Sequence, residues 1–91
     1  MGDDTIGGMI PLLDSRTMND GQEFIGFLEG IEKIVSKKGE FKCFYFNSGV
    51  VTALVPFFSI SSKAKYKPED LLNKKVKLIV NQHKFFLTPL N

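Results

Sequence analysis

The chain has 91 residues, with 12 basic and 10 acidic side chains, one cysteine and one histidine. This length supports one domain with one modest core, and a single cysteine excludes an internal disulfide. No stretch approaches the roughly 18 apolar residues of a membrane span, and the N-terminus lacks the basic and apolar segments of a signal peptide. We therefore expect a soluble, cytoplasmic protein that does not engage a membrane.

The charges are divided unevenly along the chain. Residues 1–32 carry seven acidic side chains and one arginine, a net charge of −6, whereas residues 33–91 carry eleven lysines and three acidic side chains, a net charge of +8. This asymmetry predicts an anionic partner for the basic part.

Residues 1–21 are rich in Gly, Asp and Asn, with a short apolar patch over residues 9–13. Such a segment cannot bury enough surface to fold alone, so we expect an acidic arm, flexible or docked on a domain formed by residues 22–91. If the arm docks, its apolar residues would cover exposed aromatic side chains and compete with an anionic ligand for the basic face.

Residues 23–35 predict a long first strand. They contain four β-branched residues and are interrupted by Gly26 and Gly30, and glycines inside a strand mark bulges or bends that let a small sheet close on itself. A helix is the alternative, because four apolar residues between positions 27 and 35 have helical spacing.

A basic turn at residues 36–39 leads into a β-hairpin across residues 39–58. Two runs dense in aromatic and β-branched residues flank Asn47-Ser48-Gly49, a short polar break that is typical of a hairpin turn.

The first strand of this hairpin is apolar on both faces. Because side chains alternate along a strand, Phe44 and Phe46 share one face and Phe41, Cys43 and Tyr45 share the other. The first set can fill a core, whereas the second needs a partner or a second layer. We expect Cys43 to be a small buried hydrophobe and not a reactive thiol.

The rest of the chain predicts one short helix and two more strands. Residues 59–67 form a lysine-rich loop, and Pro68 to Leu72 begin with a proline and two acids, which suit the first turn of a helix. Residues 75–80 alternate as a strand with Val76, Leu78 and Val80 inward. After a turn at residues 81–83, residues 84–88 form a last strand with Phe85 and Leu87 inward.

Three strands, a helix and two strands predict an all-β fold, the five-stranded oligonucleotide-binding (OB) barrel of Greek-key type with a short helix between strands three and four. An SH3-like barrel has the same strand count. The bent first strand and the position of the helix favour the OB barrel.

Residues 26–88 also resemble a known family, the RNA-binding OB repeat of the large small-subunit ribosomal protein and of several ribonucleases. Gly30, Gly39 and Phe41 are similar to its first glycine and its Gly-x-Phe signature, and Leu-Val-Pro-Phe-Phe-Ser-Ile-Ser at 54–61 resembles its Leu-Val-His-x-Ser-x-Ile-Ser stretch. The resemblance implies an OB barrel with Phe41 at an RNA-binding surface. The family's other binding positions hold different residues here.

The candidate site combines aromatic side chains with lysines. Bases stack on exposed aromatics, and lysines neutralise phosphates, so we predict non-catalytic binding of single-stranded RNA or DNA with Phe41 and Tyr45 as the stacking platform. Further contacts are predicted for Phe57 and Phe86 and for the lysines Lys33, Lys37, Lys38, Lys42, Lys75, Lys77 and Lys84.

Each assignment has an alternative. Phe41 and Tyr45 could form a second hydrophobic layer under the arm or a partner protein, and the lysines could be an ordinary solvated surface. A one-residue error in register would turn Phe57, Phe58 or Phe86 to the opposite face. The competing function is an OB domain used as a protein-interaction module in a larger replication, repair or translation complex.

Catalysis has little support in the sequence. Neither His83 nor Cys43 has a neighbour at a nucleophile-base spacing, metal-ligand spacing of Cys and His is absent, and no Gly-rich phosphate loop occurs. We expect no enzymatic activity, no cofactor and no metal.

Overall fold

The computed structural model of the protein describes residues 5–6 and 10–90, and its regular elements are strands and short 3-10 helices. A small hairpin of β1 (Thr5–Ile6) and β2 (Ile10–Pro11) precedes the main strands, which are β3 (Glu23–Ser36), β4 (Gly39–Asn47), β5 (Thr52–Pro56), β6 (Lys75–Asn81) and β7 (Lys84–Pro89). The 3-10 helices are η1 (Ser15–Thr17), η2 (Phe57–Ser59) and η3 (Pro68–Leu71). Within the described residues no helix is long and apolar enough to cross a membrane.

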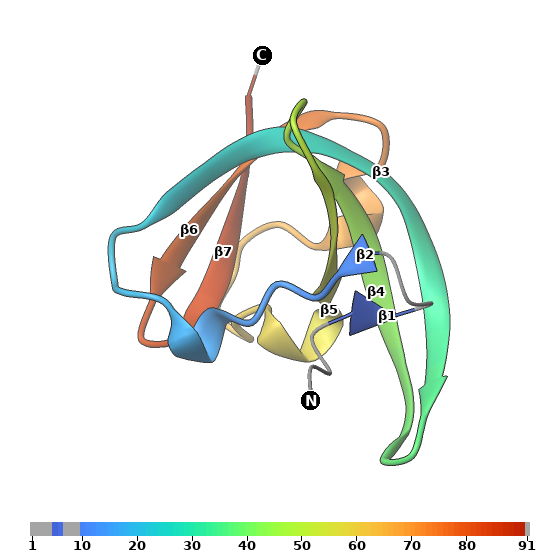
Figure 1. Ribbon diagram of the computed structural model, residues 1–91. Coiled ribbons are helices and arrows are strands. Elements are labelled where there is room, and N and C mark those ends of the chain that lie inside the picture. The colour runs from blue at the N-terminus through green and yellow to red at the C-terminus, as the bar shows by residue number, and fades with distance from the viewer. Residues whose placement is uncertain (1–4, 7–9, 91) are drawn as a thin grey trace.

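The five main strands form one antiparallel sheet in the order β5-β4-β3-β6-β7 (Figure 1). The long strand β3 lies at the centre, where its first half pairs with β6 and its second half with β4. The prediction of a five-stranded, β-rich domain is confirmed, and the helical alternative for residues 23–35 is wrong.

The two outer strands of the sheet, β5 and β7, each receive a single bridge from another segment. Ile60 forms an isolated parallel bridge with Phe85 of β7, and the Ser61 N–H donates to the Phe85 carbonyl at 3.0 Å. On the other side, Leu12 forms a parallel bridge with Leu54 of β5.

The bend expected in the first strand is present in β3. The pairing of β3 with β4 shifts register between Leu28 and Gly30, and an extra residue in one strand of an antiparallel pair bends it and increases its twist. In Figure 1 β3 arches over the molecule and passes from the side of β6 to the side of β4.

One continuous core fills the inner face of the curved sheet. Phe44 and Phe46 of β4 belong to it, as alternation predicted, and so do the inward residues of β6 and β7. Burying an aromatic or aliphatic side chain of this size contributes about 1.5 to 3 kcal/mol. The buried members of this core are Leu28, Phe44, Phe46, Val55, Leu71, Val76, Leu78, Val80, Phe85 and Leu87.

The helix expected over residues 68–72 is a single 3-10 turn, η3. Pro68 begins this turn, and Leu71 is buried in the core. Asn73 follows with φ of 64°, a left-handed conformation that Asn tolerates better than most residues.

The part of the N-terminal arm that the structure describes is docked. In Figure 1 it crosses the front of the molecule, from beside β5 to the turn between β6 and β7. The Ser15 hydroxyl is buried and donates to the His83 carbonyl at 2.7 Å. Gly21 and Gln22 continue the contact, because the Gly21 N–H donates to Val80 and the Val80 N–H donates to Gln22. Met9 and residues 1–4, also assigned to the arm, lie outside the described residues.

Candidate nucleic-acid interface

A second apolar cluster lies on the outer face of the sheet. Ile34 of β3, Cys43 of β4 and Leu54 of β5 are buried there, and Phe41 and Tyr45 pack against them half-buried. Register explains the grouping, because Phe41 lies opposite Ile34 and Tyr45 opposite Leu54. These five residues are called the outer cluster below.

Cys43 lies at the centre of the outer cluster with a fully buried side chain. Burial raises the pKa of its thiol to about 11, and the nearby charge of Glu32 adds to this shift. A neutral, buried thiol packs as a small hydrophobe and is a poor nucleophile, so the prediction that Cys43 is buried is confirmed.

Two arm residues, Ile10 and Leu12, pack against the outer cluster. The Leu13 N–H extends the contact by donating to the Leu54 carbonyl at 2.8 Å. A second hydrophobic layer, the alternative considered for Phe41 and Tyr45, is therefore present over the same buried residues that both aromatics contact.

The most accessible aromatic group lies at one end of the outer cluster. Phe58 is 54% exposed, and its ring meets Phe41 edge to face with 5.2 Å between the ring centroids. The Lys84 ammonium donates to the Phe58 carbonyl at 2.8 Å, and its two other N–H groups remain available to an anion. Phe41, Phe58 and Lys84 are called the aromatic corner below.

Phe57 and Phe58 have opposite environments. Phe57 packs against the core and meets Phe44 edge to face, 6.4 Å between centroids. The exposed residue is thus Phe58, and the assignment of Phe57 as a surface contact is not supported by its position. The alternation of β5 continues through these residues, because Val55 and Phe57 face the core whereas Leu54 and Phe58 lie on the outer side.

Four of the predicted lysines lie along the ribbon formed by β3 and β4. Lys37 and Lys38 occupy the turn between these strands, three to four residues from Phe41. Lys33 and Lys42 lie opposite each other across the ribbon, but strand alternation turns them to the face away from Phe41. The turn lysines therefore lie at the end of the ribbon that is nearer to Phe41 in sequence, whereas Lys33 and Lys42 do not belong to the aromatic corner.

Lys75, Lys77 and Phe86 form part of a different surface. On the outward face of the sheet, Lys75 pairs with Phe27 of β3 and Lys77 pairs with Ile25 of β3. Phe27 is 49% exposed and Ile25 47%. This surface, called the β3–β6–β7 face, also carries Ile79 and Phe86, which lie opposite each other. The single groove expected from the sequence is therefore divided.

The Tyr45 end of the outer cluster is more acidic than the Phe41 end. The Tyr45 hydroxyl donates to the Glu32 carboxylate, and this hydrogen bond raises the pKa of the phenol above its ordinary value. Nearby, the Asn47 amide donates to Glu29 at 2.9 Å. Two carboxylates beside Tyr45 disfavour a phosphate there.

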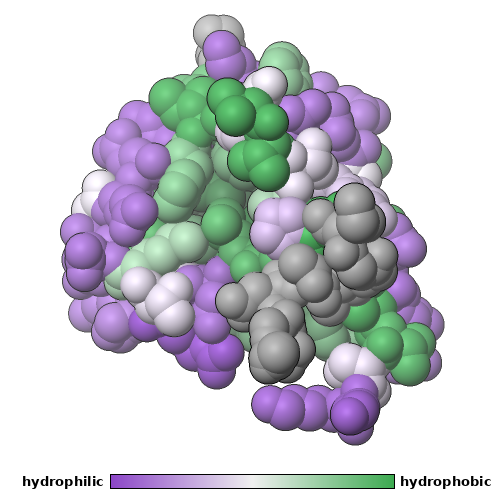
Figure 2. Space-filling view, in the orientation of Figure 1, coloured by the Kyte–Doolittle hydropathy of each residue, from purple (hydrophilic) through white to green (hydrophobic). Residues whose placement is uncertain are grey.

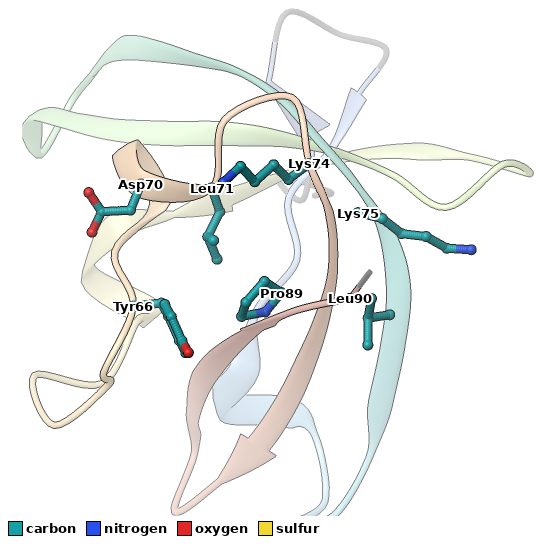
Figure 3. A pocket seen from close by; sticks show the side chains of 7 residues that line it. All are labelled: Tyr66, Asp70, Leu71, Lys74, Lys75, Pro89 and Leu90. Carbon is teal, nitrogen blue, oxygen red and sulfur yellow. The ribbon is translucent and has the colours of Figure 1, made fainter.

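A hollow of about 600 Å³ lies between η3 and the ends of β6 and β7. Figure 3 shows Tyr66, Leu71 and Pro89 around it and the Lys74 side chain extending toward Leu71, whereas Asp70 and Lys75 point outward on opposite sides. Ligand sites combine an apolar wall with polar groups that converge. The outward direction of these charged groups makes the hollow a weaker candidate than the aromatic corner.

Hydrophobic surface is also present away from the aromatic corner. Figure 2 shows a hydrophobic area at the end of the molecule where Figure 1 places the turn between β4 and β5. Val50 in this turn is 96% exposed and Val51 is 52% exposed. Hydrogen bonds hold the turn, including those from the Ser48 N–H and hydroxyl to the Val51 carbonyl at 3.1 Å.

Among residues 5–6 and 10–90, no group of three or more His, Cys, Asp or Glu side chains is arranged to hold a metal ion. Comparisons of the chain with known protein families, with curated proteins and with solved structures found no match.

Proposed function

We propose that the protein is a non-catalytic, OB-type domain that binds single-stranded nucleic acid at the aromatic corner. The sheet order supports this proposal, because β3 pairs with the second and fourth main strands as the first strand of a five-stranded Greek-key barrel does. The parallel bridge between Ile60 and Phe85 lies where the ends of such a barrel approach each other. OB domains bind oligonucleotides on their second and third strands and on the loops after strands one and four.

The observation that carries the proposal is the exposed Phe58 ring, held against Phe41 beside the Lys84 ammonium. Lys84 follows the turn after the fourth main strand, and Lys37 and Lys38 occupy the turn after the first. A stacked base contributes about 1 to 3 kcal/mol. Each phosphate neutralised on a single strand contributes about −0.7 to the slope of log K against log salt, so three lysines give a slope of about −2.

Fluorescence anisotropy with labelled single-stranded DNA and RNA of about 12 nucleotides tests the site. Phe58→Ala should weaken binding about fivefold or more, because it removes a stacking surface. Phe27→Ala is the matched control, since Phe27 is nearly as exposed but lies on the β3–β6–β7 face. A loss with Phe27→Ala and none with Phe58→Ala would move the site to that face.

The salt slope gives a second, independent measurement. Lys84→Gln should make the slope about 0.7 less negative, whereas Lys75→Gln should leave it unchanged. A slope near zero in the unaltered protein would remove the lysines from the mechanism.

A protein-interaction module is the second candidate function. The β3–β6–β7 face favours it, because Phe27 and Ile25 are each nearly half exposed on adjoining positions of one strand face. Contiguous exposed apolar surface is typical of protein interaction sites. The absence of single-strand binding by the folded protein would favour this second function.

A further inference from the structure

We propose that the start of the arm, residues 10–13, occupies part of the nucleic-acid site and must leave when a strand binds along β4. This inference rests on the function proposed above and adds a regulatory step to the same site. The acidic arm then acts as an intramolecular competitor whose release exposes the whole outer cluster.

Ile10 and Leu12 cover a surface that a nucleic-acid strand bound along β4 would need. Phe41 and Tyr45 are four residues apart on one face of β4, so Cys43 lies between them. Ile10 and Leu12 pack on the cluster formed around Cys43. A strand that extends from the aromatic corner along β4 over Cys43 has to cross this covered surface, whereas a base at the aromatic corner alone does not.

The arm has a boundary beyond which it stays attached. From Ser15 onward it is held to the β6–β7 hairpin by the buried Ser15 hydroxyl and by two backbone hydrogen bonds with Val80. Before this point, the contacts are the Leu12 bridge, the Leu13 hydrogen bond, the packing of Ile10 and Leu12 on the outer cluster, and the packing of the half-buried Leu13 on the core. The Asp14 carboxylate is paired with Arg16 in its own turn at 3.0 Å. Residues 10–13 can therefore detach while residues 15–22 remain in place.

Tethering and charge both make the competition effective. A segment joined this closely to its site acts at a high effective concentration, and the acidic Asp3 and Asp4 precede it in the sequence. If the docked form outnumbers the open form by about ten to one, the apparent affinity for a strand that needs the whole cluster falls about tenfold. By linkage, a bound strand weakens arm docking by the same factor.

Hydrogen exchange tests arm release directly in the full chain. The Leu13 N–H bonds to Leu54 and the Gly21 N–H bonds to Val80, both at 2.8 Å. When a single-stranded oligonucleotide of about 12 nucleotides saturates the protein, exchange of the Leu13 amide should become about tenfold faster, and exchange of the Gly21 amide should not. Unchanged or slower exchange at Leu13 with a bound strand would overturn the proposal.

A pair of matched variants tests the same point by affinity. Ile10→Ser combined with Leu12→Ser should raise single-strand affinity about three- to tenfold. The control combines Val50→Ser with Val51→Ser, which makes similar changes in an exposed turn and should leave affinity unchanged. Circular dichroism checks that both proteins are folded.

The outcomes separate this inference from the proposed function. If the unaltered protein binds single strands and Phe58→Ala weakens this binding, the proposed function is supported. If the arm variant then shows no gain in affinity, the competition by the arm is rejected. Failure of every folded variant to bind single strands rejects both.

Discussion

Gly26 of β3 lies directly against the backbone of Asn47 at the end of β4, so that a Cβ atom at Gly26 would overlap the Asn47 carbonyl oxygen. The two strands approach this closely next to the register shift that bends β3. Gly26 does not have a positive φ. Glycine is therefore required at position 26 by the close approach of the two strands and not by its own backbone conformation. Gly30, at the other side of the bend, has no such constraint, because a Cβ there would meet Tyr45 at an ordinary 3.7 Å.

The first prediction follows from this difference. Gly26→Ala should lower the free energy of unfolding by about 2 kcal/mol or more, because the strands must separate to admit a methyl group. Gly30→Ala should change it by less than about 1 kcal/mol. Urea denaturation of both variants measures the difference, and equal losses would show that the close contact with Asn47 is not limiting.

The second prediction concerns the two-residue turn between β6 and β7. Gln82 and His83 have φ of 55° and 63°, the positive values of a type I′ hairpin turn, which favours Asn-Gly. Replacing Gln82 by Asn and His83 by Gly should therefore raise the free energy of unfolding by about 1 kcal/mol. The backbone groups that bind Ser15 and Asp20 are retained by these substitutions. A lower melting temperature would contradict the assigned turn.

The third prediction is a loss of stability at alkaline pH that depends on Cys43. The pKa of this thiol is about 11 in the folded protein and near 9 when it is exposed. The neutral thiol is thus favoured by folding, so its contribution is fully present below pH 9 and is lost as pH rises toward 11. The loss should amount to about 2 kcal/mol. Denaturation of the protein and of Cys43→Ala from pH 8 to 11 measures it, and parallel pH profiles would exclude the thiol as the cause.

The fourth prediction separates two neighbouring aromatics by stability. Phe57→Ala should lower the free energy of unfolding by about 2 to 3 kcal/mol, because Phe57 is half-buried against the core. Phe58→Ala should lower it by less than about 1 kcal/mol, since mainly its edge contact with Phe41 is lost. Thermal unfolding of the two variants side by side tests this order, and the reverse order would place Phe58 in the core.

Much of the fold was predictable because alternation identifies the buried face of a strand. Phe44 and Phe46 are buried as expected, and so are the inward residues of β6 and β7. The bend in β3 was predictable from Gly26 and Gly30, which interrupt a long run with the composition of a strand. The helix between strands was reduced to one 3-10 turn, since four residues beginning at Pro68 leave little length for α-helical hydrogen bonds.

The candidate site was less predictable, because it depends on register and curvature. Alternation from Val55, which faces the core, turns Phe57 inward and Phe58 outward, so the prediction of Phe57 as the surface contact is a one-residue error in register. The lysines were predicted to border one groove, but alternation along β4 turns Lys42 away from Phe41, and strand pairing places Lys75 opposite Phe27 in another part of the sheet. Lys84 and Phe58 are 26 residues apart in the sequence, so no local sequence pattern predicts their contact.

The bridges on β5 and β7 bear on how the protein behaves at high concentration. An outer strand with free backbone groups recruits strands from other molecules and seeds aggregation. The Leu13 N–H donates a hydrogen bond to Leu54 of β5, and the Ser61 N–H donates one to Phe85 of β7. A chain that begins after residue 13 would leave β5 without this cover while β7 kept its own, so self-association of the shortened protein should proceed through β5. The arm would then protect solubility whenever no ligand is bound.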